Sequence, residues 1–240
     1  MAPPRPEALA FDMFGTVVDW RSSIAAETAV FLRRIGKGDL DPARFTDAWR
    51  YRYIGSMAAF RASGRGFTPL DTLHREMLED TLRDHGVDPA GLADDLLRDW
   101  THAWRRLTPW PDSVAGLKRL KRDFPIVTLS NGNIALMIEL ARRAKLPWDA
   151  ILGAEVTRTY KPDPQSYLRT AEILDLAPDR LCLVAAHHSD LAAARACGLA
   201  TAFIARPHEY GGRRAPDADQ AQEWDWSADS ITDLADQLGC

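Results

Sequence analysis

The chain has 240 residues, 46% of them hydrophobic, which is enough for one large domain or for a core domain with a smaller insertion. The net charge of −4 gives no electrostatic reason to expect a nucleic-acid partner, and a short basic cluster at residues 118–122 is typical of a solvated helix face. The first residues lack the apolar core of a signal peptide, and no apolar stretch approaches the roughly 20 residues that cross a bilayer. The three cysteines form no CxxC pair, which argues against a zinc or redox site. We therefore expect a soluble, cytoplasmic protein without a membrane partner.

The first element is a short apolar run over residues 8–14 that Gly15 closes. Such a run predicts a buried strand of a parallel sheet. Asp12 lies near the end of this run, and a buried carboxylate without a partner is costly. We therefore expect Asp12 to have a chemical role.

The next block, from about residue 20 to 109, shows only helical periodicity. Helices are expected over residues 22–35, 41–57, 70–85 and 92–104, with Ser22 or Ser23 as the first cap and Gly36 as the first stop. No strand is expected in this block. A helical insertion directly after a first strand predicts a cap domain over residues 20–109, with the core formed by residues 1–19 and 110–240.

The second half of the chain alternates between helices and strands. Helices are expected over residues 113–122, 134–144, 164–174 and 191–197, and strands over residues 126–130, 151–152, 181–185 and 201–204. Residues 206–226 are expected to form a long loop. This alternation predicts an α/β fold whose parallel sheet is covered by helices on both faces. Ligands of such sheets bind beyond the carboxyl ends of the strands.

Polar side chains gather at those strand ends. They are Asp12 and Thr16, then Ser130 and Asn131, then Lys161, and finally His187 and Asp190. Together they supply a nucleophile or base, hydrogen-bond donors, a fixed cation and a second carboxylate. Their convergence on one sheet edge predicts an active site.

Four segments carry a resemblance to a known family. They are Phe-Asp-x-Phe-Gly-Thr at residues 11–16, Leu-Ser-Asn-Gly at 129–132, Tyr-Lys-Pro-Asp at 160–163, and the late Asp190 after an apolar strand. In this order and with a helical block between the first two, the sequence resembles the haloacid dehalogenase superfamily. The resemblance implies a Rossmann-like parallel core with an inserted α-helical cap, and Asp12 as the nucleophile.

Phe14 narrows the resemblance to one subfamily. Phosphatases of this superfamily carry an aspartate at this position, which protonates the leaving oxygen, whereas the L-2-haloacid dehalogenases carry an aromatic residue. Halide is a weak base and leaves without a proton. The resemblance therefore implies hydrolysis of short 2-haloalkanoic acids to 2-hydroxy acids through an aspartyl ester, as in (S)-2-haloacid dehalogenases. It also implies no metal or other cofactor, and it favours a homodimer.

The same resemblance assigns roles around Asp12. Thr16 supports the nucleophile, Lys161 keeps it ionised, and Asp190 positions the hydrolytic water. Arg50 and Asn131 stabilise the departing halide. The remaining assignments concern substrate binding, by Ser130, Tyr167, His187 and the main chain at Met13 and Phe14.

The last motif departs from the subfamily pattern Ser-Ser-Asn-x-x-Asp. His187 replaces the asparagine and Ala185 replaces a serine. Because fluoride leaves only with strong hydrogen-bond support, a histidine donor beside Arg50 leads us to the hypothesis that fluoroacetate is also a substrate. His188 is interpreted as an ordinary polar residue.

Several structural interpretations remain open. Arg50 also fits a solvated helix face together with Arg52 and Tyr53, and Tyr167 also fits the core. The aromatic residues Trp49, Trp100 and Trp104 are more typical of packing between helices than of ligand contact.

Three rival functions also remain open. One is a magnesium-dependent phosphatase, and another is hydrolysis of a different activated carbon centre, such as a strained-ring amino acid. The third is a non-catalytic binding protein, against which the joint presence of all the polar residues at the strand ends argues.

Overall fold

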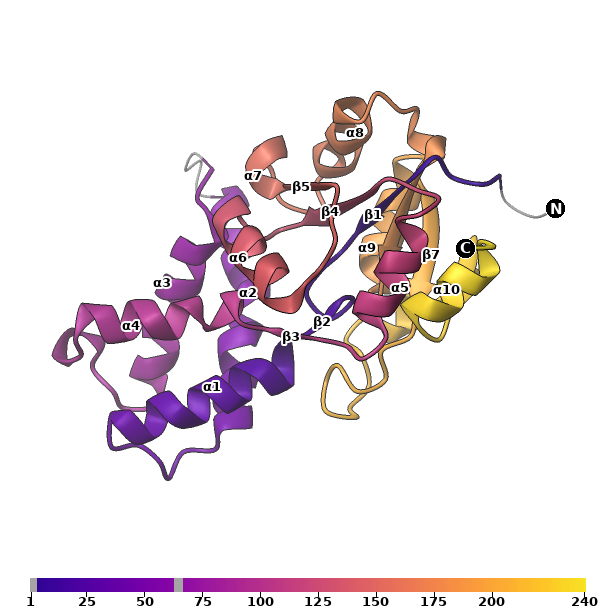
Figure 1. Ribbon diagram of the computed structural model, residues 1–240. Coiled ribbons are helices and arrows are strands. Elements are labelled where there is room, and N and C mark those ends of the chain that lie inside the picture. Colours follow the sequence, from indigo (N-terminus) through magenta and orange to yellow (C-terminus); the bar gives the residue numbers. More distant parts are fainter. Residues whose placement is uncertain (1–3, 63–66) are drawn as a thin grey trace.

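The computed structural model describes residues 4–62 and 67–240 (Figure 1). Its centre is a six-stranded sheet of order β5-β4-β1-β6-β7-β8, in which all neighbouring strands pair in parallel. The strands are β1 (Ala8–Phe11), β4 (Ile126–Ser130), β5 (Ala150–Gly153), β6 (Leu181–Ala185), β7 (Ala200–Ile204) and β8 (Trp226–Ala228). The predicted α/β fold class, with its Rossmann-like parallel core, is confirmed.

Strands β1, β4 and β6 form the middle of the sheet, and every residue in them is buried. Apolar side chains on both faces are expected of strands covered from both sides. One face packs against α5 (Ser113–Leu120), α6 (Ile134–Ala144) and α10 (Ile231–Gln237), and the other against α8 (Pro164–Ile173) and α9 (His188–Ala196). The carboxyl ends of these strands are therefore fixed by two hydrophobic cores.

A block of helices lies to one side of the sheet, at the lower left of Figure 1. It contains α1 (Trp20–Arg34), α2 (Pro42–Ala62), α3 (Leu70–Asp84) and α4 (Asp94–Thr101), followed by the 3-10 helix η2 (His102–Arg105). A short antiparallel pair, β2 (Val18–Asp19) with β3 (Thr108–Pro109), connects it to the sheet. We propose that this block, residues 20–109, acts as a cap domain on the core of residues 1–19 and 110–240.

Several elements differ from the sequence prediction in their boundaries or were not predicted. The first helix starts at Trp20, because the Asp19 carboxylate, rather than Ser22 or Ser23, caps it by accepting from the Ser22 N–H at 3.0 Å. Strand β3 lies inside the block for which no strand was expected, and it is too short to show alternation. Helix α9 begins at His188 rather than Leu191, which places Asp190 in its first turn. The loop predicted over residues 206–226 ends in strand β8, which α10 follows. The short helices α7 (Ala154–Thr157) and η4 (Ala218–Gln220) were not predicted either.

The inside of the helical block is built from tryptophans. Trp49, Trp100 and Trp104 are at most 1% exposed. Trp100 stacks on Phe31 with ring centroids 5.2 Å apart, and Trp49 meets Trp104 edge to face at 5.6 Å. Aromatic pairs at these distances add to the burial of their large surfaces. These side chains therefore pack between helices.

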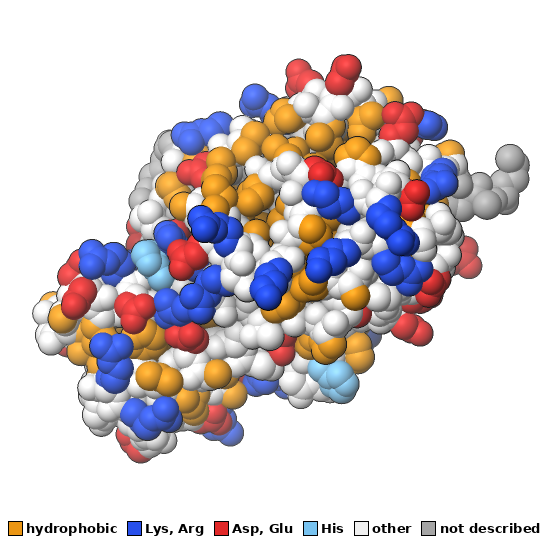
Figure 2. Space-filling view, in the orientation of Figure 1, with side chains coloured by type: hydrophobic (Ala, Val, Ile, Leu, Met, Phe, Trp, Pro, Cys, Tyr) orange, Lys and Arg blue, Asp and Glu red, His pale blue; other side chains and the backbone are white. Residues whose placement is uncertain are grey.

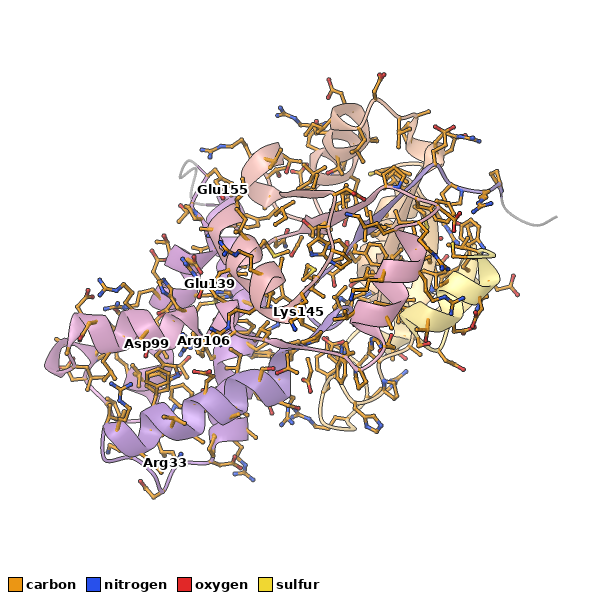
Figure 3. The ribbon with its side chains drawn as sticks, in the orientation of Figure 1. Arg33, Asp99, Arg106, Glu139, Lys145 and Glu155 are labelled. Atoms are coloured by element: carbon orange, nitrogen blue, oxygen red, sulfur yellow. The ribbon has the colours of Figure 1, made fainter. Side chains whose placement is uncertain are left out.

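Polar contacts tie the helical block to the core. Arg105 in η2 forms ion pairs with Asp71 of α3 at 2.7 Å and with Glu139 of α6 at 3.2 Å. The Asn133 amide, at the start of α6, also donates to Asp71 at 2.9 Å. In Figure 3, Glu139 and Arg106 lie close to this junction, and Arg106 pairs with Asp99 of α4 at 3.1 Å. These contacts hold the helices beside the carboxyl ends of the sheet.

The molecular surface carries charges of both signs. Lys and Arg side chains are interspersed with Asp and Glu over the face drawn in Figure 2, in agreement with the small net charge of −4. No helix among the described residues is long and apolar enough to cross a membrane.

Candidate active site

Asp12 follows the last residue of β1 and is only 6% exposed. The Thr16 hydroxyl donates to its Oδ2 at 2.8 Å, and the Lys161 ammonium donates to its Oδ1 at 2.9 Å. The Nδ1 of His187 lies 3.3 Å from Oδ2. Burial alone would raise the pKa of Asp12, but the charges and hydrogen bonds of Lys161 and His187 hold it well below its usual range. Asp12 is therefore a buried carboxylate that stays ionised.

Lys161 lies between two carboxylates. Its Nζ contacts Asp12 at 2.9 Å and Asp190, in the first turn of α9, at 2.5 Å. Burial disfavours the ammonium, yet the two carboxylates raise its pKa, so it remains charged. The Tyr167 hydroxyl donates to the other oxygen of Asp190 at 2.6 Å, which fixes the orientation of that carboxylate. The two aspartates thus have a common cation between them.

The superfamily's phosphatases use a magnesium ion, and the donor set here does not suit one. The Lys161 ammonium already stands between Asp12 and Asp190, where it would repel a divalent cation. Among the described residues, no group of three or more His, Cys, Asp or Glu side chains is arranged to hold a metal. The residues present therefore do not fit a magnesium site, and no step below uses one.

A small cavity of about 210 Å³ opens over Asp12. Its walls come from both the sheet ends and α2, and its lining residues are Asp12, Phe14, Arg50, Tyr53, Asn131, Lys161, Pro162, His187, Ser189 and Asp190. Phe14 is 6% exposed and packs edge to face on Trp104, with ring centroids 5.9 Å apart. The position of the phosphatase general acid is thus occupied by an aromatic ring held in place by the helical block.

Arg50 and Tyr53 reach the cavity from α2, one helical turn apart. The guanidinium of Arg50 lies over the ring of Tyr53 at 4.5 Å and near the ring of Trp20 at 5.4 Å. Cations are stabilised over aromatic faces at such distances. Arg52 instead pairs with Asp84 on α3. The solvated-face interpretation therefore fits Arg52, whereas Arg50 and Tyr53 line the cavity.

Asn131 is held by its own hydrogen bonds. Its Oδ1 accepts from the Lys161 N–H at 2.8 Å, while its Nδ2 donates to the Tyr53 hydroxyl at 2.6 Å and to the Lys161 carbonyl at 3.3 Å. The Tyr53 oxygen accepts here, which leaves its own O–H to donate into the cavity. Burial raises the pKa of Tyr53, so the phenol stays protonated. Tyr53 is thus a candidate donor to an anion that sequence reasoning did not select.

Three predicted substrate-binding residues lie behind the cavity wall. Ser130 is 1% exposed, and its Oγ accepts from the Gly132 N–H at 3.2 Å. Tyr167 is fully buried and contacts Asp190 instead. The Met13 side chain is also fully buried. In the part of the chain that the structure describes, the main-chain N–H groups of Met13 and Phe14 donate to no backbone or side-chain acceptor, so they are candidate donors to a bound anion.

Sequence reasoning also missed Glu209. It comes from the segment between β7 and β8, is 2% exposed, and contacts His187 Nε2 through both carboxylate oxygens at 3.0 and 3.2 Å. The Trp20 indole N–H also donates to it, at 2.9 Å. No motif marks Glu209 in the sequence, since it lies in a stretch with loop composition. The one indication in the sequence is Gly15, which has φ +94°. A Cβ at this position would lie 2.2 Å from a Glu209 oxygen, so the glycine makes room for the carboxylate.

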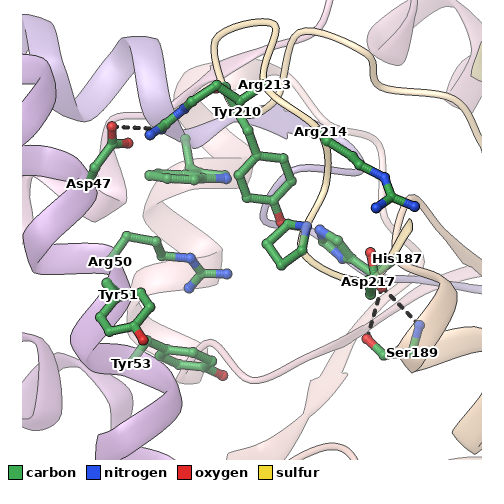
Figure 4. A pocket seen from close by; sticks show the side chains of 12 residues that line it. Asp47, Arg50, Tyr51, Tyr53, His187, Ser189, Tyr210, Arg213, Arg214 and Asp217 are labelled. Carbon is green, nitrogen blue, oxygen red and sulfur yellow. Dashed lines mark hydrogen bonds and ion pairs between the residues drawn. The ribbon is translucent and has the colours of Figure 1, made fainter. Parts of the chain in front are cut away.

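A larger cavity of about 430 Å³ adjoins the first and shares Arg50, Tyr53, His187 and Ser189 with it. Figure 4 shows Arg50 extending from α2 into this space, opposite His187. On one side Arg213 pairs with Asp47 at 2.7 Å. The lining of this larger cavity includes three arginines, Arg50, Arg213 and Arg214.

Comparisons with known proteins show to which family the chain belongs. Residues 6–198 match the family of haloacid dehalogenase-like hydrolases. An (S)-2-haloacid dehalogenase of Xanthobacter autotrophicus is 30% identical over 205 residues, which cover 83% of this chain and 75% of the relative. The chain therefore belongs to the haloacid dehalogenase-like hydrolases, and the resemblance drawn from its four motifs is confirmed.

Two solved structures add detail. A defluorinating L-2-haloacid dehalogenase superposes with a TM-score of 0.94 at 47% identity, covering 99% of this chain and 100% of that one. An L-2-haloacid dehalogenase of Xanthobacter autotrophicus with covalently bound chloropropionic acid superposes with a TM-score of 0.79 at 25% identity, and covers 98% of both chains.

Proposed function

We propose that this protein hydrolyses the carbon–halogen bond of short 2-haloalkanoic acids, fluoroacetate included, and releases the 2-hydroxy acid. The observation that carries the proposal is the ionised Asp12 beside Phe14. The cavity offers a buried carboxylate nucleophile but no acid at the position where a phosphatase would protonate its leaving group. The haloacid dehalogenases among its relatives, one of them a defluorinating enzyme, support the same substrate class.

In the first step, an oxygen of Asp12 attacks carbon 2 of the substrate from the side opposite the halogen. The new C–O bond forms as the carbon–halogen bond breaks, and the electron pair leaves with the halide. The substrate carboxylate is bound by the free N–H groups of Met13 and Phe14, and Tyr53 is a further donor for it. Arg50, which has no carboxylate partner within 4.0 Å among the described residues, stabilises the departing halide.

In the second step, water attacks the carbonyl carbon of the ester on Asp12. Asp190, held by Lys161 and Tyr167, accepts a proton from this water. The Lys161 ammonium fixes the position of Asp12, and the hydrogen bond from its main-chain N–H to Asn131 fixes the cavity wall. The Thr16 hydroxyl holds the carboxylate of Asp12 in place through its hydrogen bond to Oδ2.

The test is halide release from chloroacetate, fluoroacetate and (S)-2-chloropropionate by the wild type and by Asp12→Asn. We expect the wild type to release halide and the variant to lose turnover. Mass spectrometry of the quenched wild type is expected to show an ester on the peptide that contains Asp12. Chloride release without fluoride release would overturn the fluoroacetate claim alone. Magnesium-dependent phosphate release from phosphate esters, without halide release, would overturn the whole proposal.

Two further expectations from the sequence stay predictions: a cytoplasmic location, which the three free thiols suit, and a homodimer. Light scattering coupled to size-exclusion chromatography distinguishes the dimer from a monomer.

A further inference from the structure

His187 lies between two carboxylates. Its Nδ1 faces Asp12 Oδ2 at 3.3 Å and its Nε2 faces Glu209 at 3.0 Å. We propose that Glu209 is a positioning residue that keeps His187 in its charged imidazolium form after Asp12 has become an ester, so that His187 and Thr16 together bind the oxyanion formed when the ester is hydrolysed. This inference rests on the proposed aspartyl-ester reaction.

The first argument is the environment of Glu209. It is 2% exposed, and its only ion-pair partner among the described residues is His187. Because a buried carboxylate requires a compensating charge, Glu209 favours a positive His187. The indole N–H of Trp20 donates to the same carboxylate at 2.9 Å, but it is neutral. Among the described residues, His187 is therefore the charged partner of Glu209.

The second argument is how the segment of Glu209 is fixed. Arg206, three residues earlier, forms two hydrogen bonds with Asp112 at 2.8 and 2.9 Å and a third with the Thr16 carbonyl at 2.9 Å. Gly15 leaves the space that the Glu209 carboxylate occupies. The nucleophile loop and the Glu209 segment are therefore built to fit each other.

The third argument is the change of charge during the reaction. Burial alone would lower the pKa of His187, but Glu209 and Asp12 together raise it well above its usual range. The other ionisable side chains that line the two cavities with His187 are, in the inner one, Arg50, Tyr53, Lys161 and Asp190, and in the larger one also Asp47, Tyr51, Tyr210, Arg213, Arg214 and Asp217. Esterification removes the charge of Asp12. From that moment Glu209 is, within residues 4–62 and 67–240, the one carboxylate that still contacts His187.

The geometry also assigns the two oxygens of Asp12. Oδ2 accepts from the Thr16 hydroxyl at 2.8 Å and lies 3.3 Å from the imidazole Nδ1 of His187, while Oδ1 contacts Lys161. We therefore assign the attack on the substrate to Oδ1, which leaves Oδ2 as the carbonyl oxygen of the ester. The hydroxyl donor and the adjacent imidazolium stabilise the negative charge that develops on that atom.

The hydrolysis then balances as follows. The water oxygen bonds to Cγ of Asp12, one water proton passes to Asp190, and the carbonyl electron pair moves to Oδ2, where Thr16 and His187 donate to it. When this pair returns, the Cγ–Oδ1 bond breaks. Oδ1 leaves with the product and takes the proton from Asp190. The regenerated carboxyl group of Asp12 releases its remaining proton to solvent, and His187 keeps its charge throughout.

The first test is rapid-quench kinetics of Glu209→Gln with (S)-2-chloropropionate. The amide keeps the size and the acceptor oxygen but loses the charge. We expect a burst of chloride close to one per active site, followed by turnover slowed by about 10- to 100-fold, because one oxyanion donor is weakened. The ester should accumulate on the Asp12 peptide. Slowing of the burst itself without ester accumulation would overturn the inference.

The matched control is Asp225→Asn, the same change of carboxylate to amide at the end of the same segment. Asp225 accepts a hydrogen bond at 2.8 Å from the N–H of Thr201, near the start of strand β7. It lines neither cavity. We expect its burst and turnover to match those of the wild type. Glu209→Asp, which keeps the charge, is expected to recover part of the turnover that Glu209→Gln loses.

A second readout needs no substrate. Asp12→Asn mimics the neutral ester, so His187 can be followed by NMR of ¹³Cε1-labelled histidine in Asp12→Asn and in Asp12→Asn/Glu209→Gln, with a His187→Asn variant to assign the signal. We expect His187 to remain protonated through pH 8 in the first protein and to lose its proton near its ordinary pKa in the second. The same titration in both would overturn the inference. If the wild type releases no halide while this difference is present, the dehalogenase proposal fails and the role of Glu209 in the charge of His187 stands.

Discussion

At the residue scale, the site depends on one cation between two carboxylates. Lys161 contacts Asp12 and Asp190 at 2.9 and 2.5 Å, and it is the largest influence that lowers the pKa of Asp12 against the effect of burial. A neutral side chain at this position leaves two buried carboxylates without their common partner. The ionisation of the nucleophile thus depends on a residue from a different motif.

This dependence predicts the pH profile of Lys161→Gln. Because the cation lowers the pKa of Asp12, its loss raises that pKa, and the nucleophile becomes protonated at a higher pH. We expect the acid limb of kcat/KM for chloroacetate to move up by about 1–3 pH units, with a lower plateau. Lys145→Gln, on the surface end of α6, is the control. An acid limb at the wild-type position would show that Lys161 does not set the ionisation of Asp12.

Tyr53 gives a second prediction at this scale. Its oxygen accepts from Asn131 at 2.6 Å, so its own hydroxyl proton is directed elsewhere, and it lines the cavity. If it binds the substrate carboxylate, Tyr53→Phe should raise KM for chloroacetate by about tenfold or more, the effect of losing a hydrogen bond to a charged group. Tyr51→Phe, two residues away and 80% exposed, should leave KM unchanged. Equal KM values in all three proteins would exclude Tyr53 from substrate binding.

At the element scale, the segment between β7 and β8 forms one wall of the site. Its anchor is Arg206, which forms a double hydrogen bond with Asp112 ahead of α5 and bonds the Thr16 carbonyl in the nucleophile loop. The side chain of Arg206 is 8% exposed. One buried guanidinium therefore connects three segments that are distant in sequence.

Removal of this anchor should affect both stability and activity. Breaking a buried ion pair by deleting one partner costs about 3–5 kcal/mol, so we expect Arg206→Met to lower the free energy of unfolding by about 3 kcal/mol in urea denaturation. Arg206→Lys keeps the charge but loses the planar double contact. It should unfold nearer to the wild type while halide release still falls. Wild-type activity in Arg206→Lys would show that the segment needs no precise anchor.

At the scale of the whole molecule, stability is expected to fall on mild acidification because of His74. This residue of α3 is 1% exposed, stacks on Trp104 at 4.4 Å, and its Nδ1 has no hydrogen-bond partner among the described residues. Burial and the charge of Arg50 hold its pKa well below the ordinary value. Below pH about 6.5 the unfolded chain therefore binds a proton that the folded chain does not.

The sign is fixed by this difference in bound protons. From pH 6.5 to 5.0 we expect His74 to lower the free energy of unfolding, by at most about 1.4 kcal/mol per pH unit. The raised pKa of His187 opposes this effect only weakly, since the folded residue is protonated throughout and the unfolded one becomes fully protonated as the pH falls below about 6.5. His102, whose pKa is also lowered, contributes a slope of the same sign. Urea midpoints at both pH values should differ less in His74→Phe than in the wild type; an unchanged difference would contradict this account.

The fold class and most residues that surround the nucleophile could be predicted from the amino-acid sequence. Apolar runs and their turn residues predicted the buried strands, and parallel strands deliver their carboxyl ends to one edge, so Asp12, Lys161 and Asp190 had to lie near one another. Phe14 stands where the superfamily's phosphatases carry an aspartate, which indicated a leaving group that needs no proton. These are local or periodic properties, which a single sequence contains.

Which side chains reach the cavity depends on how the elements pack in three dimensions, and the sequence did not predict it. Ser130 and Tyr167 lie behind its wall, whereas Tyr53 of α2 lines it, because the packing of α2 among the helices decides which of its faces is turned to the cavity. The contact between His187 and Glu209 joins a strand end to a segment of loop composition. No periodicity records such a contact, since it depends on how the chain returns across the sheet and on the space that Gly15 leaves for a buried carboxylate.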